Sequence, residues 1–160
     1  MESPIGPLTL AARSGRLCLL HFGADRPAVE ATLGRWYAGE SLSQPSGPMP
    51  AAERLEAYFG GETTALDGLD VELNGTPFQR RVWEALRAVR AGQTASYGDV
   101  ARSIGAPAAV RAVGAANGAN PVAIVVPCHR IIGASGSLTG YGGGLERKRW
   151  LLQHERAGLF

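Results

Sequence analysis

Short apolar runs bounded by turn residues open the chain. Residues 8–11 and 16–22 are predicted to form two strands, and Ser14-Gly15 between them predicts the turn of a hairpin. A third strand is predicted farther along, where apolar and polar residues alternate at Leu69, Val71 and Leu73.

Two helices are predicted between these strands. The first covers 27–37 and begins with a proline, and the second covers 51–59 and stops at Gly60-Gly61. The Gly-, Ser- and Pro-rich stretch 39–50 between them is predicted to be a loop. None of these segments suggests chemistry, so we expect the first half to be a scaffold.

After Asn74-Gly75 the pattern changes to closely spaced helices. Segments 76–79 and 96–99 have the form of capping boxes, and they predict helices that end at Gly92 and Gly105. A further helix is predicted over 107–118. Two short helices around a Gly-Ala-Pro turn are typical of a helix-turn-helix.

The last part of the chain brings polar residues to the end of an apolar run. Residues 122–126 are continuously apolar and predict a buried extended segment, which leads into Pro127-Cys128-His129-Arg130. A glycine-rich loop over 140–144 then precedes a final helix, predicted over 145–156.

Charge changes sign where the pattern changes. Residues 1–74 carry five arginines and ten acidic residues, a net charge of −5, whereas residues 75–160 carry eleven basic and four acidic residues, a net charge of +7. We therefore predict two domains, 1–74 and 75–160, of which the second faces a polyanion. A solvated basic surface without a partner is the alternative.

Cysteine usage and hydropathy narrow the class of protein. Two cysteines fall far short of a disulfide framework, and the opening residues do not form a secretory signal. No apolar run approaches the ~20 residues that span a bilayer. We expect a soluble protein of the reducing cytoplasm, away from membranes, in which both thiols are free.

Cys128 is the candidate nucleophile. His129 and Arg130 follow it, and cationic neighbours favour the thiolate form of a cysteine. Adjacent residues of an extended chain point to opposite sides, so a water or a local turn has to connect Cys128 to His129. An inert buried thiol is the alternative, and it is the interpretation that fits Cys18.

A base such as His129 needs a third group that orients it. Glu155 follows Leu151 and Leu152 by four and three residues, which places it on the face of the last helix that should be buried. A buried carboxylate needs a partner, and His129 can supply one. A surface glutamate near a frayed helix end is the alternative.

The second helix of the helix-turn-helix is unusually smooth. Residues 108–116 are Ala, Val and Gly except for Arg111, so the helix offers few side chains that read base edges. Such a surface suits close approach to a duplex with little sequence preference, with Arg111 as a phosphate contact or a wedge in the base stack. A helix packed against the core is the alternative.

The residues around Cys128 resemble the active-site signature of the O6-alkylguanine-DNA alkyltransferases, also called methylated-DNA–protein-cysteine methyltransferases. The matching segments run in order through the second half, and the opening residues 3–8 also resemble bacterial members. They are 75–79, Val82-Trp83, Ser96-Tyr97, 111–114, Asn120-Pro121, 124–130, Tyr141 and His154-Glu155.

The resemblance implies an α+β fold, with a small ribonuclease-H-like α/β domain followed by a winged-helix-like domain that contains the helix-turn-helix. It also implies direct-reversal DNA repair, in which Cys128 takes a methyl or alkyl group from guanine O6, irreversibly and once per molecule. His129 would act as the base through a water, Glu155 would orient His129, and Asn120 would hold the active-site segment by hydrogen bonds.

The resemblance further implies minor-groove binding and extrusion of the damaged base. Tyr97 would lie against that base, and Arg111 would fill the gap left in the duplex. The expected DNA- and base-binding set is Tyr97, Arg111, Ala112, Gly114, Arg130, Tyr141, Gly142 and Gly143.

The expected partner is double-stranded DNA that carries O6-alkylguanine, bound by a monomer with little sequence preference and without a cofactor. Cooperative binding and action on thymine O4 are left open.

Two departures from the family pattern matter. Gly142 follows Tyr141 where some relatives have a serine, which leaves only a backbone N–H for the base oxygen. Some relatives bind a structural zinc in the first domain, whereas here Cys18 and His21 are its only candidate ligands. Two ligands are too few for a closed zinc site, so we expect no metal.

Two other classes compete with this interpretation. A Cys-His hydrolase would turn over repeatedly and would need an oxyanion hole, but a basic helix-turn-helix half gives it no evident use. A DNA-binding protein without transfer activity, either a regulator or an alkyltransferase-like lesion binder, is the second. Such lesion binders lack cysteine at the nucleophile position, whereas this chain has Cys128.

Overall fold

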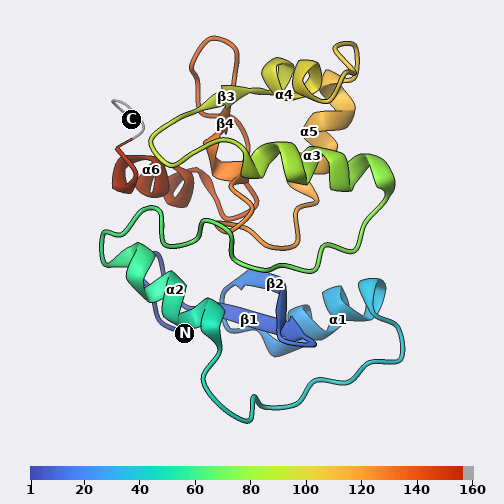
Figure 1. Ribbon diagram of the computed structural model, residues 1–160, viewed down its shortest axis with the longest axis vertical. Helices are drawn as coiled ribbons and strands as arrows, with labels where there is room; N and C mark the ends of the chain where they lie inside the picture. The colour runs from blue at the N-terminus through green and yellow to red at the C-terminus, as the bar shows by residue number, and fades with distance from the viewer. Residues whose placement is uncertain (157–160) are drawn as a thin grey trace.

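The computed structural model describes residues 1–156, and its elements form two groups that follow the chain order (Figure 1). The lower group in that view comes from the first half: β1 (Leu8–Arg13), β2 (Arg16–Phe22), α1 (Arg26–Trp36) and α2 (Pro50–Phe59). The upper group comes from the second half: α3 (Pro77–Arg87), β3 (Ala95–Ser96), α4 (Tyr97–Ser103), α5 (Val110–Gly118), η1 (Cys128–Arg130), β4 (Ile131–Ile132) and α6 (Leu145–His154).

The predicted hairpin is confirmed. β1 and β2 pair antiparallel from Leu8 opposite Phe22 to Arg13 opposite Arg16, with a register shift after Ala11. The turn residues Ser14 and Gly15 both have positive φ, 52° and 78°. Two-residue turns of this hand match the twist of the flanking strands, and the pair Ser-Gly supplies the glycine that they favour.

The predicted third strand is wrong. Val71 forms one isolated bridge with Leu17, and no ladder extends from it within the described residues. Two other main-chain oxygens of this segment accept hydrogen bonds from arginine side chains, Leu69 O from Arg87 and Val71 O from Arg16. The alternation therefore reports burial of Leu69 and Val71 correctly, but not strand pairing.

The two helices of the first half form where they were predicted. The side chain of Asp25 caps α1 by accepting from the Ala28 N–H over 3.2 Å. α2 begins at a proline, which suits the first turn of a helix because its missing N–H has no partner there. The Gly-, Ser- and Pro-rich stretch between α1 and α2 is a loop, as expected.

The helices of the second half differ from the prediction only at their ends. Capping boxes start α3 and α4, from Thr76 and Ser96. α3 ends at Arg87, before Gly92, because the following residues form turns. α5 starts at Val110, after a turn over 107–109, and α4 and α5 together form the helix-turn-helix. The short strands β3 and β4 pair in parallel beside them. No helix of residues 1–156 is long and apolar enough to cross a membrane.

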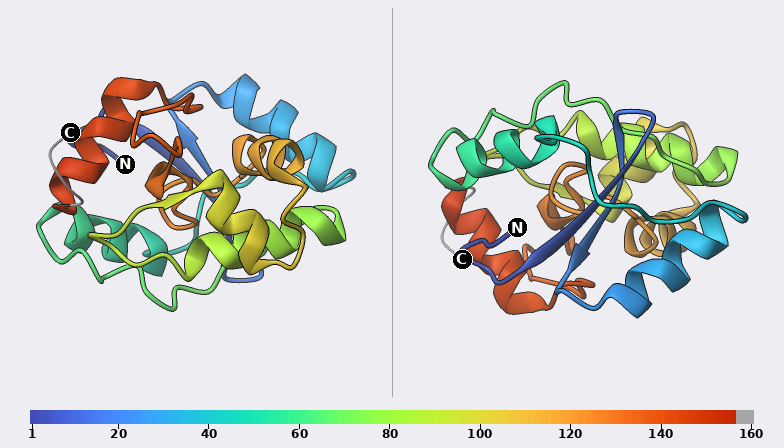
Figure 2. Two further views of the ribbon diagram at one scale, coloured as in Figure 1. Left: turned by 90° about the horizontal axis from the view of Figure 1, so that it is seen from above. Right: turned by 90° about the horizontal axis from the view of Figure 1, so that it is seen from below.

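One hydrophobic core joins the two halves. Leu55 and Tyr58 of α2 belong to the same buried cluster as Trp83 of α3 and Val126 before η1. A bridge between Leu20 and Val122 adds a main-chain link. Seen from above and below, α2 and α6 lie at the same end of the molecule (Figure 2). The Cys128 segment is therefore fixed from both halves.

Candidate active site

The segment before Cys128 is a tight turn, not the extended run predicted over 122–126. The Val126 N–H donates to Val122 O over 2.9 Å. Ile124 has a φ of 72°, a region that β-branched residues rarely adopt. The side chains of 122–126 are buried as predicted. A short apolar run indicates burial but cannot distinguish a buried strand from a buried turn.

Asn120 fastens this turn at both ends. Its Nδ2 donates to Val126 O over 2.8 Å, and its Oδ1 accepts from the Val122 N–H over 2.9 Å. Unusual backbone geometry persists only where surrounding contacts over-determine it. The side chain of Asn120 thus lies where its expected role requires.

Cys128 follows as the first residue of the single-turn helix η1, so a local turn replaces an extended chain at the nucleophile. The residue is buried, and burial raises the pKa of its thiol. The amide of Asn120 and the charge of Lys148 act in the opposite direction and lower that pKa. The sulfur therefore stays protonated at neutral pH until a base takes its proton.

His129 is arranged as that base. It is fully buried, and its Nε2 lies 2.8 Å from Glu155 Oε1. Burial lowers the pKa of His129, and the carboxylate offsets this only in part, so the imidazole is neutral at pH 7. Because an ionised carboxylate only accepts, Nε2 carries the proton and Nδ1 is the free acceptor. Within residues 1–156, Nδ1 has no hydrogen-bond partner.

Glu155 is the centre of a buried polar network. It follows the last residue of α6 and accepts hydrogen bonds from Tyr58, His129 and Arg130. Burial raises the pKa of Glu155, but the hydrogen bonds from His129 and Arg130 and the charge of Arg130 outweigh it and lower the pKa to about 2. The structure thus brings Glu155 and His129 together, as the helical spacing indicated.

Arg130 does not lie where the sequence analysis placed it. It was expected among the DNA-binding residues, but it is buried and only 5% exposed. Its Nε and Nη2 donate to Glu155 over 3.0 and 2.9 Å, and its Nη1 donates to Val89 O over 2.6 Å. Every guanidinium nitrogen is bonded inside the protein, so Arg130 supports Glu155 and is not available to DNA.

Sequence reasoning missed two buried polar residues of the site, Lys148 and Tyr58. Lys148 of α6 is fully buried, and its Nζ donates to Ile131 O over 2.5 Å and Thr139 O over 3.3 Å. Burial lowers the pKa of Lys148. The spacing that identified Glu155 also places Lys148 on the buried face of α6, seven residues earlier. Tyr58 comes from the first half, and no local pattern links it to Glu155.

A pocket of about 130 Å³ opens beside Cys128. Tyr141, Gly142 and Gly143 of the glycine-rich loop form part of its wall, as expected. A Cβ at position 143 would approach the rings of Phe22 and Tyr141 to 2.8 Å, whereas a Cβ at position 142 would meet nothing within 4 Å. The absence of a side chain at Gly143 therefore allows the loop to pack against Phe22. Gly142 lies beside open space, at the opening of the pocket.

Phe22 and Asn117 are among the wall residues of this pocket that were not predicted. Phe22 ends β2 in the first half, and its ring meets that of Tyr141 edge-on at 5.8 Å. Asn117 of α5 is 5% exposed, and its Oδ1 has no partner among the described residues. The hydroxyl of Tyr141 is likewise buried without a partner within 1–156. The pocket beside the sulfur thus combines aromatic walls with unpaired polar atoms.

The remaining predicted DNA-binding residues lie on the helix-turn-helix. Arg111 and Ala112 are exposed on α5, and Gly114 is half-buried under the Tyr97 ring, whose Cδ1 would lie 3.9 Å from a Cβ at that position. The Tyr97 hydroxyl is hydrogen-bonded to Thr139 Oγ1 at 2.8 Å. The exposed face of α5 is therefore smooth and carries one long cation.

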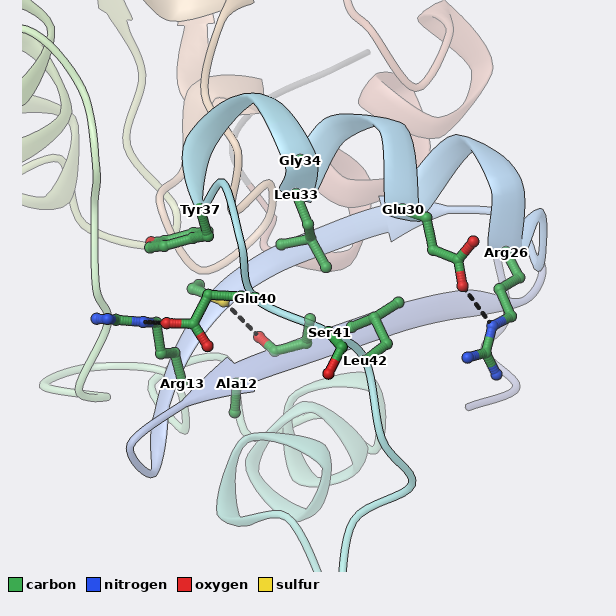
Figure 3. Close-up of a pocket in the computed structure, with 12 residues that line it drawn as sticks. Ala12, Arg13, Arg26, Glu30, Leu33, Gly34, Tyr37, Glu40, Ser41 and Leu42 are labelled. Atoms are coloured by element: carbon green, nitrogen blue, oxygen red, sulfur yellow. Dashed lines mark hydrogen bonds and ion pairs between the residues drawn. The ribbon is translucent and has the colours of Figure 1, made fainter.

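The other cysteine lies in a different setting. Cys18 is buried on β2 beside a cavity of about 370 Å³ between the hairpin, α1 and residues 40–42 (Figure 3). Its thiol donates to Ala11 O over 3.4 Å, and burial raises its pKa. The charged residues of the cavity wall pair with one another, Arg13 with Glu40 and Arg26 with Glu30. The thiol of Cys18 thus bonds to a main-chain oxygen and does not precede a histidine as Cys128 does.

Metal ligands do not gather in the described part of the chain. Residues 1–156 contain no group of three or more His, Cys, Asp and Glu side chains that could hold a metal ion.

Comparison with known proteins covers both halves. Residues 1–73 match the family model described as 6-O-methylguanine DNA methyltransferase, ribonuclease-like domain, and residues 77–157 match the DNA binding domain of that family. The chain is 47% identical over 158 residues to a methylated-DNA–protein-cysteine methyltransferase of Salmonella typhimurium, which covers 97% of this chain and 92% of that protein. It is 53% identical over 156 residues to that of Mycolicibacterium paratuberculosis, covering 98% and 90%.

A solved structure is similar over nearly the whole chain. OGT of Mycobacterium tuberculosis, crystallised in complex with DNA, has a TM-score of 0.82 to this fold at 47% sequence identity. The similarity covers 98% of this chain and 91% of that one.

Proposed function

Because the chain belongs to the 6-O-methylguanine DNA methyltransferase family, we propose that it repairs DNA directly, by moving an alkyl group from guanine O6 to Sγ of Cys128. A bond forms between Sγ and the alkyl carbon, and the bond between that carbon and O6 breaks. The thiol proton leaves the sulfur, and guanine regains a proton. A thioether lies outside thiol–disulfide exchange, so each molecule acts once and Cys18 cannot restore it.

One observation carries this proposal: the buried Cys128 thiol borders a pocket and directly precedes a neutral histidine that a carboxylate orients. Glu155 fixes the proton of His129 on Nε2, so Nδ1 is the basic nitrogen. Direct contact between adjacent side chains is not required, because a water can relay the thiol proton to Nδ1. As the proton leaves, the nearby Lys148 charge stabilises the thiolate.

The alkylated base has to leave the duplex to reach the sulfur. Extrusion costs a few kcal/mol, and less where a lesion has weakened base pairing. The pocket volume of about 130 Å³ is close to that of a cavity that holds a single six-membered ring. A purine has two fused rings, so it has to fill the pocket and also extend into the opening at Gly142, between Tyr141 and the helix-turn-helix.

The smooth face of α5 is the surface that we assign to DNA. Ala112 and Gly114 allow the helix to approach the minor groove closely, and Arg111 replaces the extruded nucleotide in the stack. Tyr97, which begins α4, would exchange its bond to Thr139 for contacts with the extruded nucleotide. Because this surface offers few groups that read base edges, we expect little preference for the flanking sequence.

The proposal also includes the oligomeric state, the domain boundary and the cellular compartment. It acts as a monomer on double-stranded DNA without a cofactor. The domain boundary lies near Asn74-Gly75, with 1–74 as the scaffold and 75–160 as the DNA-binding and transfer unit. Two free thiols suit a reducing compartment, and we assign the protein to the cytoplasm.

Incubation with duplex DNA that carries labelled methyl on guanine O6 tests the proposal against its rivals. Alkyl transfer predicts protein-bound label that saturates at one equivalent per chain. A Cys-His hydrolase would instead release labelled small molecules over many turnovers. A DNA-binding protein without transfer activity would retain the DNA and leave the label on it, and either result would overturn the proposal.

A further inference from the structure

Tyr58 connects the first half of the chain to the catalytic network. It lies in α2 with its side chain fully buried, and its hydroxyl donates to Glu155 Oε1 over 2.7 Å. The same oxygen accepts from His129 Nε2 at 2.8 Å and from Arg130 Nη2 at 2.9 Å. Tyr58 and His129 therefore share one carboxylate oxygen.

We propose that Tyr58 is a positioning residue for alkyl transfer, which sets the orientation and effective charge of Glu155 and through them the basicity of His129. This inference rests on the proposed function. It assigns the first half of the chain a part in the chemistry beyond that of a scaffold.

The position of Tyr58 is fixed independently of its hydroxyl. His154 Nε2 donates to Tyr58 O over 2.6 Å, and the two rings meet edge-on at 5.1 Å. The His154 ring also stacks on Trp150 at 4.7 Å. α2 is thus held against the end of α6 by main-chain and ring contacts. These contacts fix the ring of Tyr58, so its hydroxyl is held in place beside Glu155.

Tyr58 is a third donor to the carboxylate of Glu155, beside His129 and Arg130. Glu155 follows the last helical residue, where the main chain is least constrained. Arg130 binds both carboxylate oxygens, Nε to Oε2 and Nη2 to Oε1. Tyr58 approaches only Oε1, and this contact fixes that oxygen where His129 meets it.

The hydroxyl also reduces the negative charge of Glu155 that acts on His129. The groups that act on His129 are Glu155 at the end of α6, Arg130 from η1 and Lys148 from α6. Tyr58 acts from α2 through Glu155. A hydrogen bond to the charged form of a carboxylate spreads its charge, so loss of the Tyr58 hydroxyl makes His129 more basic. A more basic His129 stays protonated to higher pH, where it cannot accept the thiol proton.

The test uses the full chain with Tyr58→Phe, which removes one oxygen and keeps the ring packing. Tyr37→Phe is the matched control, because Tyr37 lies in the same half and its buried hydroxyl has no partner within residues 1–156. Single-turnover transfer is measured from about pH 5 to about pH 9, the range around histidine titration. Nitrogen NMR of His129 in the unreacted protein reports its protonation without DNA.

Tyr58→Phe is expected to slow transfer about tenfold at neutral pH, the loss that corresponds to one hydrogen bond to a charged group. The rise of the transfer rate on the acidic side of the pH profile (the acidic limb) should move to higher pH by about half a pH unit or more. The His129 nitrogen signals should change in parallel. A ring-fluorinated tyrosine at position 58, a stronger donor, should move the limb and the signals the other way. Tyr37→Phe should change neither.

Unchanged rates, pH limb and His129 signals in Tyr58→Phe would overturn the inference, even if the variant melts at a lower temperature, because a merely structural role predicts that pattern. If the wild type transfers no label, the proposed function fails, and the His129 signals still decide whether Tyr58 acts on the histidine. A signal shift supports this action, and identical signals refute it.

Discussion

The two cysteines lie in regions that bury a thiol equally well and differ in what surrounds it. Cys18 sits in the hairpin with Ala11 O as its hydrogen-bond acceptor. Burial raises the pKa of its thiol, and the charge of Glu72 raises it further. Cys128 sits between a strained turn and a neutral histidine. Burial raises the pKa of its thiol as well, but there Asn120 and the Lys148 cation oppose that rise. Burial alone therefore does not decide which thiol reacts.

The ion pairs of the two regions differ in the same way. Arg13 and Glu40 pair across the surface of the first half, with side chains 44% and 55% exposed. Arg130 and Glu155 pair in the interior, with side chains 6% and 0% exposed. An exposed pair contributes little to stability, whereas removal of one partner of a buried pair leaves an uncompensated charge. In the second half, therefore, charged side chains are buried, which costs desolvation free energy.

The largest effect should come from the nucleophile. Cys128→Ala removes the only sulfur that residues 1–156 place at the pocket, so transfer of labelled methyl should fall below detection while binding to lesion-bearing duplex remains measurable. Gel-shift and single-turnover assays measure the two properties separately. Residual transfer in this variant would reveal a second nucleophile.

Glu155→Gln should have the next largest effect. It leaves Arg130 as an unpaired buried cation and His129 without an anionic partner, so unfolding free energy should fall by about 3–5 kcal/mol. Transfer should slow by about a hundredfold or more, as expected when a histidine loses the carboxylate that orients it. Glu40→Gln is the control and should cost at most about 1 kcal/mol. Equal losses from the two variants, measured by urea unfolding, would remove the distinction between the two regions.

Acid should weaken the protein through the same carboxylate. The pKa of Glu155 is about 2 in the folded protein and 4.5 in its ordinary state, so its contribution is complete above about pH 4.5 and is lost as pH falls towards 2. That contribution is on the order of 3 kcal/mol. The stability difference between wild type and Glu155→Gln, measured by urea unfolding, should therefore shrink over this pH range. A difference that stays constant with pH would contradict the low pKa.

Arg111→Ala should produce a smaller and more selective effect. Loss of one arginine contact to DNA costs about 1–2 kcal/mol, so repair in duplex should slow about tenfold. Attack on free O6-alkylguanine should keep its rate, because Arg111 lies outside the pocket. Arg35→Ala, an exposed arginine of the first half, should change neither rate. Equal losses on duplex and free base would exclude the wedge role.

Cys18→Ala should have the smallest effect. The thiol contributes packing and one long hydrogen bond in a small cluster of the first half, so we expect a stability loss of about 1 kcal/mol and unchanged transfer. A Cys18→Ala variant that transfers more slowly would show that the two regions are coupled through this cysteine.

Sequence patterns predicted the local features of the molecule well. Capping boxes gave the starts of α3 and α4, and helical spacing brought Glu155 to the buried face of α6. The same spacing could have identified Lys148. These features depend on neighbours within two turns of helix, which a single sequence displays directly.

Features that depend on distant partners were missed. The segment predicted as a strand at Leu69–Leu73 pairs at a single bridge with Leu17, and its alternation gives no information on that distant partner. Arg130 was placed at the DNA surface because its sequence position gave no sign of the buried Glu155 beside it. Tyr58 is 97 residues from Glu155, and only the folded chain brings them together.

Peptide mass spectrometry tests the central claim most directly. After incubation with excess duplex that carries O6-methylguanine, the peptide with Cys128 should carry one methyl group in place of its thiol hydrogen in every molecule, a net gain of CH2. The peptide with Cys18 should gain nothing. An unmodified Cys128 peptide alongside repaired DNA, or methyl found on Cys18, would contradict the account.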